Sequence, residues 1–177
     1  NPTYKVVSSN FNSIHLIKKE KSPHVFNKTK VIELKSGKDV LNNWIFFNTM
    51  LISKNCFDNV GLFDENNKTC QDLSMQLKLV KNFSIYNLNN ILVTHRFHSD
   101  QTSVKIKKFH IEERNRFHKS LTKIYSHTFF GKTKRDAFLF LGDYGMKNNL
   151  INSAIFYYKK ALRENYFSPK LILLILF

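Results

Sequence analysis

The chain has 177 residues, of which 42% are hydrophobic and 14% aromatic, so it can form a packed core and is not a disordered chain. Lys and Arg number 28 against 13 Asp and Glu, and the formal net charge of +15 favours anionic partners over cationic ones: nucleic acid, phosphates or an anionic membrane surface. The basic residues are spread along the chain, so a solvated surface explains the excess equally well.

Cysteine content and hydropathy limit the class of protein further. Cys56 and Cys70 have neither C-x-x-C spacing nor neighbouring histidines, so we expect reduced structural thiols instead of a zinc site or a disulfide. The apolar run LILLILF, residues 171–177, is far shorter than the roughly 20 residues of a membrane-spanning helix. No charged segment followed by an apolar one opens the chain. We therefore expect the protein in the cytoplasm or on the inner face of the plasma membrane.

The first part of the chain contains short runs typical of strands. Residues 4–9 predict a strand, residues 11–19 a second strand or an extension of the first, and the apolar run 44–53 a further strand. Residues 18–30 are mostly polar and predict a loop. A short helix is expected over residues 38–43.

The stretch NVGLFDENNKTCQDLSMQLKL, residues 59–79, places three carboxylates in a basic chain. Residues 66–69 favour a loop, whereas Leu73, Leu77 and Val80 recur at helical spacing. Asp72 then lies in the first turn of a helix, where free amide groups and the helix dipole favour a negative charge. Two interpretations are open: Thr69 and Asp72 form a loose capping box, or the carboxylate has a chemical role.

The second half changes from strands to helices. Residues 83–94 predict two strands separated by a turn at Asn89 and Asn90, and a polar segment follows at 95–103. A basic helix is expected from residue 105 onward, with a break at residues 131–133. The pattern predicts an α/β domain over 1–103 followed by an α-helical tail over 104–177.

The order of these motifs resembles a known family. The run NTMLISKNCFDNVGLFDE, a polar loop, QDLSMQLKL and THRFHSDQTS resemble the acceptor half of family 2 glycosyltransferases over roughly residues 1–103. This resemblance implies a partial GT-A fold, the nucleotide-sugar transferase sheet with its helices. Gln71 stands where the family usually has an acid, and His95 stands where a tyrosine is common.

The resemblance also implies roles for individual residues. Asp72 would be the general base that takes a proton from the acceptor hydroxyl in an inverting transfer. Asn48, Thr49, Trp44 and Gln71 would line the acceptor pocket, although Trp44 equally suits the core. Arg96 and His98 would approach a phosphate or a metal ion. The alternatives are a structural ion pair of Arg96 with Asp64 or Glu65 and a surface position for His98.

Cofactor and partners follow from the same resemblance. The family uses a divalent metal, Mg or Mn, held mainly by a D-x-D motif, and no D-x-D occurs in these residues. We therefore expect the acceptor half of a longer transferase, which by itself does not bind a nucleotide sugar tightly. The implied partners are a nucleotide-sugar donor and a glycan or lipid-linked acceptor in cell-surface polysaccharide synthesis, with no specific nucleic acid.

The tail resembles one tetratricopeptide unit, at about residues 134–169. Its matching positions are Ala154, Tyr158, Ala161, Leu162 and Pro169. The basic residues of the preceding helix, with LILLILF, predict a peripheral contact with an anionic membrane, unless they form only a solvated face and a buried helix. The alternative function for the whole chain is a non-catalytic basic helical module that binds protein, nucleic acid or membrane.

Overall fold

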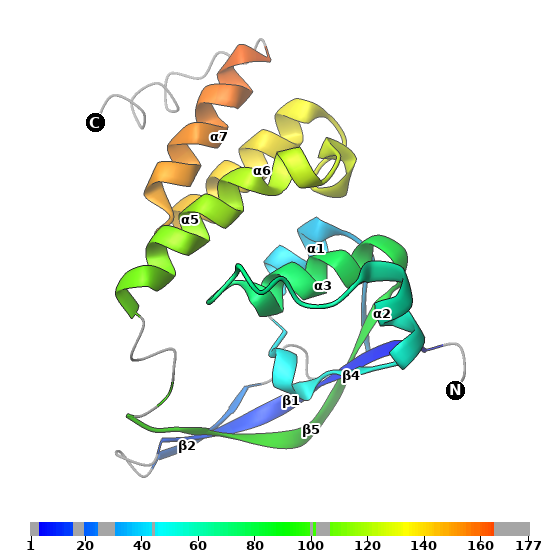
Figure 1. Ribbon diagram of the computed structural model, residues 1–177. Coiled ribbons are helices and arrows are strands. Elements are labelled where there is room, and N and C mark those ends of the chain that lie inside the picture. Colours follow the sequence, from blue (N-terminus) through cyan, green and yellow to red (C-terminus); the bar gives the residue numbers. More distant parts are fainter. Residues whose placement is uncertain are drawn as a thin grey trace. The chain divides into compact units, whose positions relative to one another are not determined.

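The computed structural model describes residues 4–15, 20–24, 31–43, 45–99, 101 and 107–164, which fall into two compact units (Figure 1). An α/β unit comprises Asn1–Asn67 and Gln71–Lys107, and a helical unit comprises Lys68–Cys70 and Lys108–Phe177. The predicted LILLILF helix and Pro169 lie outside the described residues, as does Trp44.

The α/β unit is built on a mixed sheet. Its strands are β1 (Val6–His15), β2 (Glu20–His24), β3 (Ile32–Leu34), β4 (Leu51–Ile52) and β5 (Ile85–Phe97). The order is β2-β1-β5-β3, and β4 pairs with the start of β1. β1 and β5 are parallel, whereas the other pairs are antiparallel. The expected α/β class is confirmed as a mixed sheet with helices.

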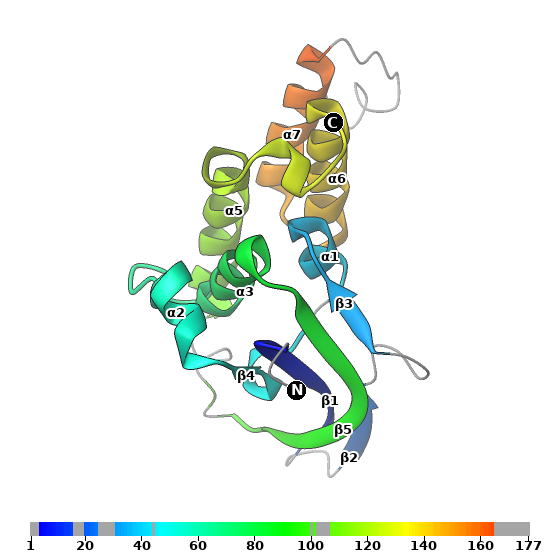
Figure 2. The same ribbon diagram turned by 90° about the vertical axis from the view of Figure 1, so that its right-hand side faces the viewer.

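β5 is one continuous strand, and the prediction of two strands with a turn at Asn89 and Asn90 is wrong. Ser9 pairs with Leu88 and Phe11 with Val93, so β5 accommodates extra residues there at two register shifts. Such bulges bend a strand without ending it. Figure 2 shows β5 as a strongly curved ribbon alongside β1. Both halves of β5 pair with β1, and this long-range pairing overrides the local turn preference of two asparagines.

The connection from β1 to β5 holds the other elements of this unit. They are α1 (Gly37–Asn42), the short helix η1 (Phe47–Thr49), α2 (Lys54–Val60) and α3 (Gln71–Asn82). α1 and α3 lie over the same face of the sheet (Figures 1 and 2). The predicted helices at 38–43 and after residue 70 are confirmed.

Two local predictions for this connection are wrong. Residues 44–53 do not form a long strand, because η1 and the two-residue β4 occupy that segment. Residues 18–30 are not all loop, because β2 pairs antiparallel with the second half of β1. In both segments, pairing with β1 determines which residues form a strand. α2 was not predicted; it ends at Val60, and the following C-cap residue, Gly61, has a φ of 75° that suits glycine.

The interior of the α/β unit is apolar around a small polar network. Fully buried apolar side chains come from four elements: Val6, Leu34, Leu77, Leu79 and Ile85. Between β1 and β5, Ser8 Oγ donates to Asn87 Oδ1 at 2.8 Å, and Asn87 Nδ2 donates to Asn10 Oδ1 at 3.3 Å. Asn10 Nδ2 in turn donates to the carbonyl of Asn89 at 2.9 Å. The network joins the two parallel strands next to their register shifts.

Replacing Asn87 with alanine tests the network. Asn87 is 2% exposed, and its loss leaves the Ser8 hydroxyl without its buried acceptor. We expect Asn87→Ala to lower the free energy of unfolding by about 1 to 3 kcal/mol, measured by urea denaturation. The matched control is Asn90→Ala, an exposed position on the same strand, with an expected change within about 0.5 kcal/mol. Equal effects of the two substitutions would contradict a structural role for the network.

The helical unit contains α5 (Lys107–Ile124), the short helix η2 (His127–Phe129), α6 (Lys134–Lys147) and α7 (Ile151–Arg163). The predicted basic helix and the break after it are confirmed. The break ends where Thr133 and Asp136 form a capping box at the start of α6. Within the described part of the chain, no helix is both long and apolar enough to cross a membrane.

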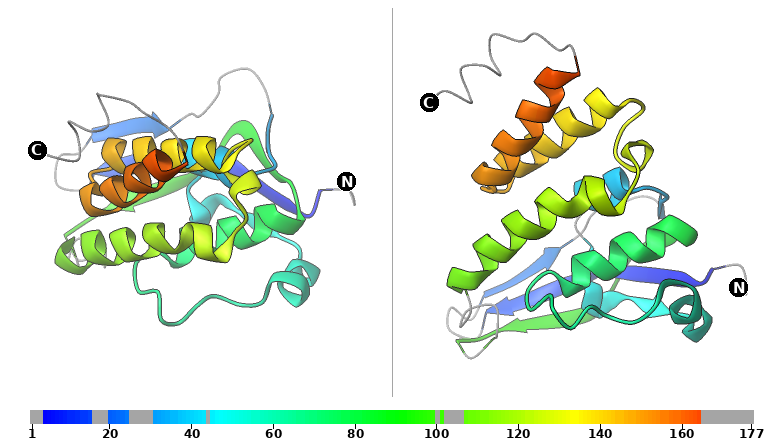
Figure 3. Two further views of the ribbon diagram at one scale, coloured as in Figure 1. Left: turned by 90° about the horizontal axis from the view of Figure 1, so that it is seen from above. Right: turned by 45° about the horizontal axis from the view of Figure 1, so that its top comes forward.

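α6 and α7 pack side by side at close range (Figure 3). A Cβ at Gly142 would clash with the ring of Tyr158, and one at Gly145 would lie 3.1 Å from Ala154. Glycines on α6 thus admit the small and aromatic residues of α7. This helix pair agrees with the expected tail, although its identity as a tetratricopeptide unit remains a prediction.

A buried histidine joins α5 to α7. His118 Nδ1 shares a hydrogen bond with Ser153 Oγ, and Tyr157 Oη donates to the carbonyl of His118 at 2.6 Å. The centre of the His118 ring also lies 5.2 Å from the centre of the Tyr144 ring. Burial, with a smaller contribution from the Arg114 charge, lowers the pKa of His118 to about 3. The imidazole is therefore neutral in the folded protein near neutral pH.

This shift predicts an acid-sensitive stability. Below pH 6.5 the unfolded chain protonates His118, whereas the folded chain does so only near pH 3, so stability falls as the pH drops between these values. The slope should approach about 1.4 kcal/mol per pH unit. Denaturant unfolding of wild type and His118→Gln between pH 7 and 4 checks it. The variant should lose this part of the slope, and His127→Gln should retain it.

Candidate functional site

Asp72 is the second residue of α3, and its side chain is exposed. Its carboxylate makes no hydrogen bond or ion pair with any described residue of the protein. Partial burial nevertheless raises the pKa of Asp72 above the ordinary value of 3.8. A higher pKa makes the carboxylate a stronger base. The structure thus presents a carboxylate at a helix start that remains available to a ligand.

The capping-box interpretation of Thr69 and Asp72 is wrong. α3 begins at Gln71, so Thr69 lies one residue too early to be the N-cap. Thr69 instead bonds within the helical unit: its amide and hydroxyl donate to Glu113 Oε2 at 3.1 and 2.9 Å. Glu113 is 6% exposed, and sequence reasoning missed it. Its only signal was the pair of acids, Glu112 and Glu113, inside a basic helix.

Asn48 and Thr49, the predicted acceptor residues of η1, differ in their surroundings. Thr49 is 9% exposed; its hydroxyl donates to the carbonyl of Phe46 at 2.8 Å and accepts from the amide of Ser9 at 3.4 Å. Asn48 is exposed, and its side chain has no hydrogen bond within the described structure. Thr49 therefore fastens η1 to β1, while the amide of Asn48 is accessible to a ligand.

Gln71, the fourth predicted acceptor residue, is half-buried beside Asp72 in the chain. Its Oε1 is buried and has no hydrogen-bond partner among the described residues. A buried acceptor oxygen without a partner is costly, unless a ligand or water supplies a donor. The structure also ties α3 to the segment that leads into η1, because Gln76 Nε2 donates to the carbonyl of Ile45 at 2.9 Å.

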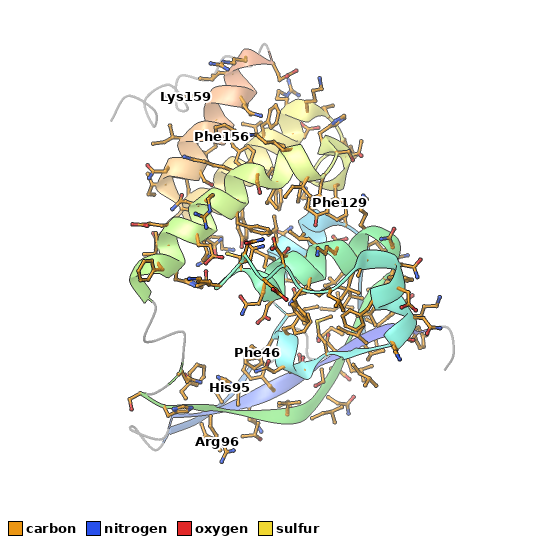
Figure 4. All side chains as sticks on the ribbon, in the orientation of Figure 1. Phe46, His95, Arg96, Phe129, Phe156 and Lys159 are labelled. Atoms are coloured by element: carbon orange, nitrogen blue, oxygen red, sulfur yellow. The ribbon has the colours of Figure 1, made fainter. Side chains whose placement is uncertain are left out.

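Arg96 and His98 lie at the end of β5 and are not part of the cluster of aromatic side chains around His95. β5 alternates its faces, so Arg96 points away from the side that carries His95 (Figure 4). Arg96 forms no ion pair with Asp64 or Glu65, all three of which the structure describes, so the structural pairing is wrong. Both Arg96 and His98 are exposed.

An aromatic cluster that the sequence analysis missed lies on the other face of β5. The ring of Phe46 is 4.7 Å from that of Phe11 and 4.6 Å from that of His95, and His95 is 4.5 Å from Phe97. Gln101 Nε2 lies 3.2 Å from His95 Nε2. The alternation of Val93, His95 and Phe97 was a signal for this shared face. Phe46, the residue before η1, therefore packs against the middle of β1 and the last part of β5.

The described residues do not fit a metal site. They contain no group of three or more His, Cys, Asp or Glu side chains able to hold a metal ion. His98 and Arg96, the residues predicted to approach one, are exposed and offer a single metal-binding nitrogen between them.

Similarity to known proteins is partial. An uncharacterized glycosyltransferase of Rickettsia bellii (strain RML369-C) is 36% identical over 93 residues. The match covers 52% of this chain but only 13% of that protein, so the chain spans a small part of its relative's length. No family model matches the chain, and no solved structure matches it. The similarity supports sugar transfer in general terms.

The contrast between Asn48 and Thr49 is testable. We expect Thr49→Val to lower the free energy of unfolding by about 1 to 3 kcal/mol, because the buried amide of Ser9 and carbonyl of Phe46 lose a partner. Asn48→Ala should change it by no more than about 0.5 kcal/mol. Urea denaturation measures both. A large loss for Asn48→Ala would show that this residue is structural.

Proposed function

We propose that the chain forms the acceptor side of an inverting family 2 glycosyltransferase. It would move a sugar from a nucleotide-sugar donor to a glycan or lipid-linked acceptor in cell-surface polysaccharide synthesis. The observation that supports this proposal most directly is Asp72, an accessible carboxylate with a raised pKa and no structural partner among the described residues. The similarity to the rickettsial glycosyltransferase supports sugar transfer.

Asp72 would act as the general base. In an inverting transfer the acceptor oxygen forms a bond to the anomeric carbon while the bond to the nucleotide diphosphate breaks on the opposite face of the sugar. The hydroxyl proton passes to the Asp72 carboxylate as the new bond forms. The first turn of α3 fixes the direction of this carboxylate, and its raised pKa improves it as a base.

Polar groups of η1 and of the first turn of α3 would orient the acceptor. Asn48 offers an exposed amide, whereas the Gln71 carbonyl oxygen, which has no partner within the described residues, is buried and would reach the acceptor only after its side chain turns outward. η1, which carries Asn48, is fastened to β1 through Thr49, and α3, which carries Gln71, is bonded through Gln76 to the segment before η1. The proposal places the reaction in the cytoplasm, with a peripheral contact at the inner face of the plasma membrane if the acceptor is lipid-linked.

Asp72→Asn in the full-length protein tests the assignment. The amide cannot accept the proton, so we expect the transfer rate to fall by about 10² to 10⁴-fold. The melting temperature should stay nearly unchanged, because the exposed carboxylate has no bond to lose within the described structure. Transfer of labelled sugar from nucleotide-sugar donors to an acceptor extract measures the rate.

Asp58→Asn provides the matched control for this experiment. Asp58 is an exposed aspartate of α2 in the same unit and should keep full activity when changed. Activity of Asp72→Asn above roughly a tenth of wild type would exclude the general-base role. Retained activity together with a large fall in melting temperature would instead show that Asp72 serves the stability of α3.

A further inference from the structure

A groove runs between α5 and α7 in the helical unit and has a volume of about 620 Å³. Its size is within the range of small-molecule sites. Among the described residues its walls come from these two helices, and the lining residues are Ile111, Glu112, Asn115, Arg116, Lys119, Ser120, Lys123, Asn152 and Phe156.

The spacing of the lining residues explains why they share one surface. On α5 they recur every three or four positions, from Glu112 to Lys123, and on α7 Asn152 and Phe156 are four apart. The helices are held together by other side chains, such as His118 and Tyr157. The groove face is therefore not needed for the contact between the helices.

The α5 wall carries a row of positive charge. Arg116, Lys119 and Lys123 follow each other at about 4.5 and 6 Å along the helix axis, from the rise of 1.5 Å per residue. None of the three forms an ion pair with a carboxylate of the described residues, and Glu112 does not reach Arg116 although it lies four positions before it. The row is thus free to bind an anion.

The groove also offers uncharged polar groups and one ring. Ser120 donates its hydroxyl proton to the carbonyl of Phe117 at 2.6 Å, which leaves its oxygen free to accept. The amide of Asn152 is exposed and makes no hydrogen bond to a described residue. Phe156 comes from α7 (Figure 4) and contributes a ring to the wall, with Lys160 Nζ over that ring at 4.9 Å from its centre. Hydroxyl-binding groups, cations and an aromatic ring together match a sugar that carries negative charge.

We infer that this groove binds an acidic oligosaccharide, a short glycan whose sugars carry carboxylate groups. The inference rests on the proposed function, because such a glycan would be the growing acceptor chain. The cations pair with its carboxylates, Ser120 and Asn152 bind its hydroxyls, and Phe156 packs on a sugar ring.

Other anionic partners fit the groove less well. Single-stranded nucleic acid is bound by successive aromatic rings, and the groove has one. An extended peptide needs a row of apolar pockets, and Ile111 and Phe156 are the apolar side chains here. A flat bilayer does not reach the floor of a groove. A second copy of a chain with a formal charge of +15 offers little complementary charge.

The test is calorimetric titration of the 177-residue chain at low salt with tetragalacturonic acid. We expect it to bind at least about tenfold more tightly than neutral maltotetraose, hexaglutamate or an eight-nucleotide thymidine strand. Vesicles of phosphatidylglycerol should not compete with it. Equal binding of the neutral sugar, or tighter binding of the peptide, the nucleotide strand or the vesicles, would overturn the inference.

Variants locate the binding to the groove. The double variant Arg116→Gln with Lys119→Gln should bind tetragalacturonic acid at least about tenfold more weakly than the wild type. Lys134→Gln with Lys147→Gln removes two exposed cations of α6 outside the groove and should change binding less than about twofold. Equal losses for both pairs would show general attraction to a basic protein and overturn the inference.

Two further variants test the contribution of the Phe156 ring and the independence of probe binding from Asp72. Phe156→Leu keeps an apolar side chain but removes the ring, and we expect about threefold or greater weakening; unchanged binding would remove the ring from the site. Asp72→Asn should bind the probe as wild type does. Failure of the transfer assay with intact probe binding would reject the proposed function alone, whereas absent probe binding with intact transfer would reject the groove alone.

Discussion

The parallel pairing of β1 with β5 is the constraint on which the α/β unit depends. Two parallel strands cannot be joined by a tight turn, so the chain between them must cross over the sheet. That crossover contains α1, η1, β4, α2 and α3, and with them every predicted acceptor residue and Asp72. The side chains of the proposed site are therefore positioned by one long connection whose two ends are fixed in neighbouring strands.

The pairing is held by polar groups as well as apolar ones. Val6 and Ile85 are fully buried at its start, while Ser8, Asn10 and Asn87 bond to each other where the register shifts. Buried polar groups tolerate few arrangements, because each donor needs its acceptor. Such a network favours one register over its neighbours, and the register in turn decides that His95 shares a face with Phe11 and that Arg96 does not.

Local sequence patterns predicted the elements that depend on local periodicity. α3 and α5 were found from their apolar spacing, and the start of α6 from the break before it. The failures share a different physical cause. β2 is a polar segment that forms a strand because it pairs with β1. Asn89 lies inside β5 because β5 pairs with β1 on both sides of a bulge. Neither of these strand pairings can be inferred from the pattern of about ten consecutive residues.

The same distinction applies to the site. Sequence similarity proposed Asn48 and Thr49 together, yet only the structure separates an exposed amide from a buried hydroxyl that holds η1 to β1. It also missed Glu113 and Phe46, whose roles depend on contacts with distant segments. Placement in the first turn of α3 could be inferred for Asp72, because that requires only the start of a helix.

The carboxylates of this basic chain show how structural and functional groups can be told apart. Asp39 and Asp136 bind the backbone at helix starts, Asp143 accepts from the hydroxyl of Tyr158, and Glu113 binds Thr69. Each of these satisfies donors within its own unit. Asp72 occupies a comparable helix start without such a donor, and burial raises its pKa with no described bond to offset the cost. Under the proposed function, the acceptor hydroxyl would supply the donor that the described residues do not.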